Sequence, residues 1–178
     1  MQKNSTKKMV YAGLLLALGL VLPFLTAQIP SIGSMLLPMH LPVLLTGFIC
    51  GWPYGLIVGL ITPILRSLMF GMPPMFPVAI AMAFELASYG ALTGFIYGLL
   101  PKKPWSVYVA LLGAMLGGRV VWGSAMYMLL ASRGGAFTWP AFMAGAFINA
   151  IPGIILQIVL IPILVLALEK AGFITKEA

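Results

Sequence analysis

The sequence contains no aspartate, and it has only three glutamates, one histidine and one cysteine. Without aspartate a Ser–His–Asp triad cannot be built, and so few ligating side chains make a metal centre improbable. Neither a P-loop motif nor an HExxH motif is present. We therefore expect no enzymatic activity, no ATP hydrolysis by this chain, and no metal or other cofactor.

Charge of either sign is also scarce. Only 7% of the residues are charged and 62% are hydrophobic, whereas a soluble domain carries about 25% charged residues. A soluble core of 178 residues could not bury so much apolar surface. The apolar segments are continuous rather than alternating, which favours helices over a β-barrel. The sequence thus predicts an all-α integral membrane protein with a single domain over residues 1–178.

Proline, glycine and lysine divide the chain into apolar segments. We expect six transmembrane helices, over residues 9–27, 39–50, 53–70, 78–100, 105–132 and 141–170. The helix over residues 39–50 is short for a span and could instead be re-entrant or tilted. With six passes, every lysine lies on one side of the membrane: Lys3, Lys7, Lys8, Lys102, Lys103, Lys170 and Lys176. The positive-inside rule makes that side cytoplasmic, so both termini are expected in the cytoplasm. This topology explains the net charge of +7 without a nucleic-acid partner.

A few polar residues interrupt the apolar helices on the expected outer half. Glu85 is the only charge between Arg66 and Lys102. At about 1.5 Å per residue, Glu85, Arg119 and Asn149 come from three helices at comparable depths, and His40 begins a fourth helix at the outer face. Ionisable residues inside a membrane are costly and usually functional. This convergence is the most informative feature of the sequence.

Aromatic side chains accompany these polar groups at helical spacing. Trp122 lies three residues after Arg119, and Tyr89 lies four residues after Glu85. Aromatic faces with a few placed polar groups are typical of a site for a small ligand. The expected substrate-binding residues are Glu85, Arg119, Asn149, Trp122, His40 and Tyr89.

Each of these residues also has a purely structural interpretation. Glu85 and Arg119 could form only an interhelical salt bridge, and Asn149 could only hold two helices together. Trp122 could pack in the core or face lipid. His40 could merely cap the helix that it begins.

Two loops on the expected outer side are unusually apolar. They read QIPSIGSMLLPMH and GMPPMFP. We expect them to fold inward over the site as a lid. The alternative is that they anchor the chain at the membrane interface.

The first helix carries a surface of small residues. Ala12, Gly13 and Ala17 lie near one another on this helix, and Gly13 and Ala17 have the four-residue spacing that lets another helix approach closely. We expect these residues to dock a second helix, which belongs either to this chain or to a partner subunit.

The chain resembles the S components of energy-coupling factor (ECF) vitamin transporters over nearly its whole length. The resemblance implies a membrane subunit that binds a vitamin with its fourth to sixth helices and outer loops. It also implies a bacterial plasma membrane, a transmembrane coupling protein and two ATPase subunits. In the family an AxxxA pattern on the first helix docks the coupling protein, and here this pattern is Gly13-x-x-x-Ala17.

Four stretches resemble a subgroup assigned to hydroxymethylpyrimidine or vitamin B6 uptake. They read LPMHLPVLLTGFICGWPYG, GMPPMFPVAIAMAFELA, GRVVWG and AFINAIPGIILQ. Pantothenate is the next candidate, because its carboxylate suits Arg119. Two other classes remain open: a self-sufficient small carrier or channel, and a membrane scaffold without a ligand. Binding of a small ligand by the purified chain, without ATPase partners, would distinguish an S component from these two classes.

Overall fold

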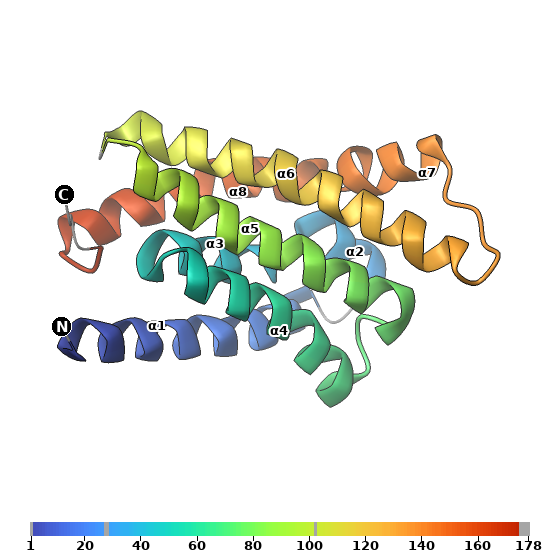
Figure 1. The fold of residues 1–178 in the computed structure, drawn as a ribbon, viewed down its shortest axis with the longest axis horizontal. Coiled ribbons are helices and arrows are strands. Elements are labelled where there is room, and N and C mark those ends of the chain that lie inside the picture. The colour runs from blue at the N-terminus through green and yellow to red at the C-terminus, as the bar shows by residue number, and fades with distance from the viewer. Residues whose placement is uncertain (1, 27–28, 102, 175–178) are drawn as a thin grey trace.

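The computed structural model describes residues 2–26, 29–101 and 103–174, and within these residues it is helical without strands. The long helices pack lengthwise into one bundle (Figure 1). In chain order the elements are α1 (Gln2–Val21), η1 (Leu22–Thr26), α2 (Pro30–Leu36), α3 (His40–Cys50), α4 (Trp52–Phe70), η2 (Met75–Ala79), α5 (Ile80–Leu99), α6 (Pro104–Ala131), α7 (Trp139–Met143), η3 (Ala144–Ile148) and α8 (Ile151–Lys170).

Five helical stretches of the described chain are long and apolar enough to cross a membrane. They are Ser5–Leu25, Trp52–Phe70, Met75–Leu99, Pro104–Ala131 and Trp139–Lys170. The remaining apolar helix, α3, has 11 residues and is therefore about 16 Å long. This is well short of the roughly 30 Å hydrocarbon core of a bilayer. The chain is a multi-pass membrane protein, and the expected span over residues 39–50 is a short helix.

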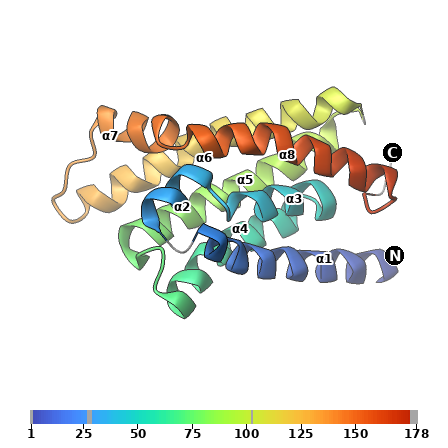
Figure 2. The same cartoon turned by 180° about the vertical axis from the view of Figure 1, so that it is seen from behind.

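Both ends of the described chain lie at the same end of the bundle (Figures 1 and 2). The connection between α5 and α6, which contains Lys103, lies at that end too. Lys102 and Lys176 belong to the lysines expected on one side of the membrane, but they lie outside the described residues. The opposite end, where α4 ends and α5 begins, is referred to below as the distal end.

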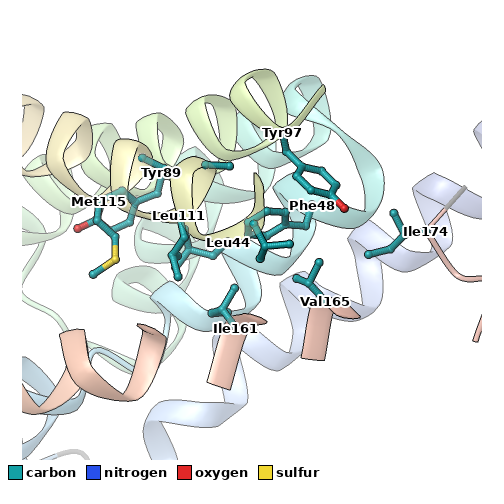
Figure 3. Close-up of a cluster of buried hydrophobic side chains, with 12 residues drawn as sticks. Leu44, Phe48, Tyr89, Tyr97, Leu111, Met115, Ile161, Val165 and Ile174 are labelled. Atoms are coloured by element: carbon teal, nitrogen blue, oxygen red, sulfur yellow. The ribbon is translucent and has the colours of Figure 1, made fainter. Parts of the chain in front are cut away.

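The core forms where α5 packs along α3, α4 and α6. Figure 3 shows one cluster of buried side chains, contributed mainly by α3, α5, α6 and α8. Its large members include Leu44, Phe48, Tyr89, Tyr97, Leu111, Met115, Ile161 and Val165. This cluster fixes the positions of α5 and α6, the two helices that carry Glu85 and Arg119.

Glycines let α4 and α5 approach until their backbones touch. A Cβ atom placed on Gly90 would lie 2.2 Å from the carbonyl oxygen of Gly55. A Cβ atom on Gly59 would lie equally close, 2.2 Å, to the carbonyl oxygen of Leu86. Small residues allow such close packing between membrane helices. These glycines therefore let α4 pack closely against the half of α5 that contains Glu85.

The elements differ from the expected helices in three places. The first helix begins at Gln2 rather than at residue 9, and the apolar loop after it contains the short helix α2. The last helix extends over the expected range, but a turn at Asn149 and Ala150 divides it before α8 begins. Proline at the second position of α8 suits a helix start there, because its missing N–H is not needed in the first turn.

Candidate functional site

A cavity of about 570 Å³ lies between the helices near the distal end. Its walls come from the η1–α2–α3 region, α4, the loop before η2, α5, α6 and the η3–α8 junction. Apolar side chains make up most of these walls, and the charged residues among them are Arg66, Glu85 and Arg119. A cavity of this size with a few polar groups fits a small organic ligand.

A buried ion pair joins α5 to α6 at the cavity. The Arg119 guanidinium donates from Nη1 to Oε1 of Glu85 at 2.8 Å. Nε2 of His40 lies 3.5 Å from the same oxygen. All three residues are at least 96% buried. Because burying an isolated charge is expensive, the arginine is what allows a carboxylate to exist here.

The same three residues keep unused hydrogen-bonding capacity. Nε and Nη2 of Arg119 have no hydrogen-bond partner among the described residues, and neither do the two ring nitrogens of His40. Only Oε1 of Glu85 takes part in the two contacts with its neighbours. Buried polar groups are normally satisfied, so unpartnered donors beside a cavity indicate a place for ligand atoms.

Trp122 and Asn149 border the cavity from the α6 and η3–α8 side. The Trp122 ring packs edge-on against Phe137 at 5.8 Å and stacks on Phe142 at 6.3 Å between centroids. A Cβ atom on Gly145 would lie 2.6 Å from the Trp122 ring, so glycine makes room for the indole. Asn149 stands at the turn where η3 ends.

Tyr89 does not border the cavity, in contrast to the other five expected site residues. It is fully buried, and its ring packs edge-on against the His40 ring with 5.3 Å between centroids. Figure 3 places it in the hydrophobic cluster. Tyr89 therefore supports the position of His40 instead of reaching the ligand space. His40 does begin α3, and only 1% of it is exposed, so it lies in the interior of the bundle.

Arg66 also borders the cavity, and the sequence interpretation did not include it. Its side chain is 2% exposed, and Nη1 donates to the carbonyl oxygen of Leu20 near the end of α1. The guanidinium lies over the Phe24 and Phe70 rings, 4.9 and 5.4 Å from their centroids. A lone charge in an apolar helix singled out Glu85, and the same criterion would have found Arg66.

Both apolar loops contribute to the cavity walls. The first supplies Ile29 and the α2 segment, and the second supplies Met72, Pro73 and Pro74. Gly153 of α8 packs closely on this region, because a Cβ atom there would lie 2.6 Å from the carbonyl oxygen of Met35. The segments expected as a lid thus lie against the ligand space.

The three expected docking residues of α1 point in different directions. Gly13 and Ala17 are exposed, and a Cβ atom on Gly13 would have open space around it. Ala12 is 6% exposed and packs in a buried cluster with Val43 and Leu86. Ala12 is therefore part of the interior, and only Gly13 and Ala17 are available to a partner.

The cavity offers groups that can recognise a small ligand. It combines apolar and aromatic walls, one ion pair and several unsatisfied donors. Among the described residues, no group of three or more His, Cys, Asp or Glu side chains could hold a metal ion. These properties suit reversible binding of a small polar molecule.

Comparison with known proteins assigns the chain to a family. A family model described as the substrate-specific component of ECF transporters matches residues 7–165. No curated protein and no solved structure gives a significant match. The matched range contains every residue that lines the cavity. The chain therefore belongs to the family of ECF transporter substrate-specific components.

Proposed function

We propose that this chain is the high-affinity binding subunit of an ECF-type importer for a small water-soluble vitamin or vitamin precursor. The family is that of a transport subunit and not of an enzyme. The observation that carries the proposal is the 570 Å³ cavity, in which a buried carboxylate, two arginines and a histidine meet beneath apolar loops.

The resemblance of the four sequence stretches ranks hydroxymethylpyrimidine or pyridoxine first, with pantothenate next. In this proposal the ring of a pyrimidine or pyridine vitamin stacks on Trp122. A ring nitrogen or hydroxyl group donates to Glu85, and Asn149 binds a second polar edge. Arg119 holds Glu85 ionised and donates to the ligand from its unpartnered nitrogens.

The proposed assembly contains a transmembrane coupling protein and two ATPase subunits in a bacterial plasma membrane. The proposed topology has six passes with both termini in the cytoplasm, α3 being the short second pass. Two observations support this arrangement: both ends of the described chain lie at one end of the bundle, and so does the start of α6, which Lys103 immediately precedes.

The experiment is titration of the purified chain, without ATPase subunits, with hydroxymethylpyrimidine, pyridoxine and pantothenate. We expect one of them to bind with a nanomolar dissociation constant in isothermal titration calorimetry. Mass spectrometry of molecules that co-purify with the chain extends the search beyond these three. Conductance across a planar bilayer would instead support a channel, and the absence of any ligand would support a scaffold.

A further inference from the structure

Among the residues that the structure describes, no carboxylate pairs with Arg66, which is a buried cation. The ion pairs among the described residues at the cavity involve Glu85 with Arg119 and His40, and none involves Arg66. An arginine stays protonated in proteins, so its charge persists although only 2% of the residue is exposed. The two phenylalanine rings and the Leu20 carbonyl oxygen lower the cost of this burial, but they bring no negative charge.

The cavity as a whole is therefore positive. Its lining contains two guanidinium groups and one carboxylate, which leaves a net charge of one with His40 neutral. The N-terminus of α3 adds to this, because the helix begins at His40 on the cavity wall and carries a partial positive charge there. No acidic residue in the first turn and no capping side chain offsets it.

From this imbalance we infer that the substrate carries an acid group, and that Arg66 binds it. The inference rests on the proposed function and narrows its substrate class. Buried charges in proteins are normally paired, so the missing partner of Arg66 is supplied by the ligand. A guanidinium binds a carboxylate through two parallel hydrogen bonds, and a single carboxylate also balances the net charge.

The same inference changes the order of the candidates. Pantothenate carries a carboxylate, whereas hydroxymethylpyrimidine and pyridoxine carry none. Glu85 then receives a hydroxyl or amide donor at the other end of the molecule. The ligand lies between Arg66 on α4 and the Glu85–Arg119 pair on α5 and α6, since all three residues border the one cavity.

The test begins with the full chain in lipid nanodiscs and a protein-free extract of bacterial small molecules. Retained molecules are identified by mass spectrometry, and the affinity of the chain is measured for the retained acid and for its methyl ester. The variants are Arg66→Gln and Arg66→Lys, with Lys103→Gln as a control that removes a charge at the other end of the bundle.

We expect the retained molecule to be an acid that binds at least tenfold more tightly than its ester. Arg66→Gln should weaken binding of the acid by roughly ten- to a hundredfold and leave the ester unchanged, because a hydrogen bond to a charged group is lost. Arg66→Lys should retain part of the affinity, and Lys103→Gln should retain all of it.

Three results would overturn the inference. The first is retention of a molecule without an acid group, and the second is equal affinity for acid and ester. The third is an equal loss of affinity for the acid and the ester in Arg66→Gln. Arg66 would then serve only to connect α4 to α1 through its hydrogen bond to Leu20. If Arg66→Gln does not fold, the comparison of acid with ester in the unchanged protein still decides. Retention of no small molecule at all would refute the proposed function itself.

Discussion

Oε1 of Glu85 lies between Arg119 and His40, and only 2% of the residue is exposed, so few groups can interact with its charge. Glu85→Gln keeps the shape of the side chain and removes the charge. We expect it to weaken substrate binding by roughly ten- to a hundredfold, since hydrogen bonds to charged groups contribute about 1.5–3 kcal/mol. Calorimetric titration measures this. Glu169→Gln, at the other end of the bundle where Tyr97 donates to Glu169, is the control and should bind normally.

A double substitution separates a binding role of Glu85 from a structural one. Arg119→Met alone should destabilise the protein by about 3–5 kcal/mol, because it strands a buried carboxylate. Adding Glu85→Gln should restore the thermal unfolding temperature, since both charges are then gone. If Glu85 contacts the substrate, the stable double variant should still bind poorly. Full affinity in a well-folded double variant would reduce the pair to a structural salt bridge.

At the residue scale, sequence reasoning identified the polar groups but not all their neighbours. Glu85, Arg119, Trp122, Asn149 and His40 could be brought together from depth along helices, because depth follows from the rise per residue. The inward placement of Tyr89 depends on which face of α5 packs on α3. That rotation is set by tertiary contacts, and a sequence that is apolar on every face does not reveal it.

Between elements, the close contact of α4 with α5 depends on the absence of side chains. Gly90→Ala places a methyl group 2.2 Å from the carbonyl oxygen of Gly55, so the two backbones must separate. We expect a loss of stability of about 1–3 kcal/mol and a lower unfolding temperature. Gly98→Ala in the same helix is the matched control, because nothing lies within 4 Å of its added methyl group. It should be neutral or slightly stabilising, since alanine favours helices more than glycine does.

The loop before α5 gives a second prediction at this scale. Met72, Pro73 and Pro74 border the cavity, and Arg133 from the loop after α6 lies 4.1 Å over the Phe76 ring. We expect residues 72–76 to become more ordered when substrate binds, as a lid does. Hydrogen exchange at their amide-bearing positions should slow with saturating substrate, whereas exchange at Ser132 should not change. Equal exchange with and without substrate would remove the lid role.

The order and extent of the long helices could be predicted from the sequence, because apolar runs between Pro, Gly and Lys clusters mark them. The segment around residues 30–36 was expected as a loop and forms α2, which begins with a proline at a position where no N–H is needed. The sequence already indicated a short helix at residues 39–50, and α3 has 11 residues. The position of α3 along the bundle axis could not be predicted. This position depends on where the preceding segment turns back, and tertiary packing decides that.

At the scale of the whole molecule, the exposed residues Gly13 and Ala17 on α1 predict a contact with a partner subunit. Gly13→Leu together with Ala17→Leu should abolish uptake by cells that contain the complete transporter, because bulky side chains block close helix approach. Substrate binding by the isolated variant should stay intact. Ala131→Leu, an exposed small-to-large change at the far end of α6, should leave uptake unaffected. A parallel loss of binding and uptake would mean that the α1 surface serves internal packing.

The length of α3 has a consequence for how this protein responds to its ligand. A helix of about 16 Å covers only about half of the hydrocarbon core, and the cavity lies beside the start of that helix. A substrate bound in the cavity would contact side chains of α3, α4, α5 and α6 and would pack as part of the core. Without a ligand these helices border a cavity of about 570 Å³. Saturation should therefore raise the melting temperature of the whole bundle and not of the distal loops alone, as expected for a ligand that binds only the native state.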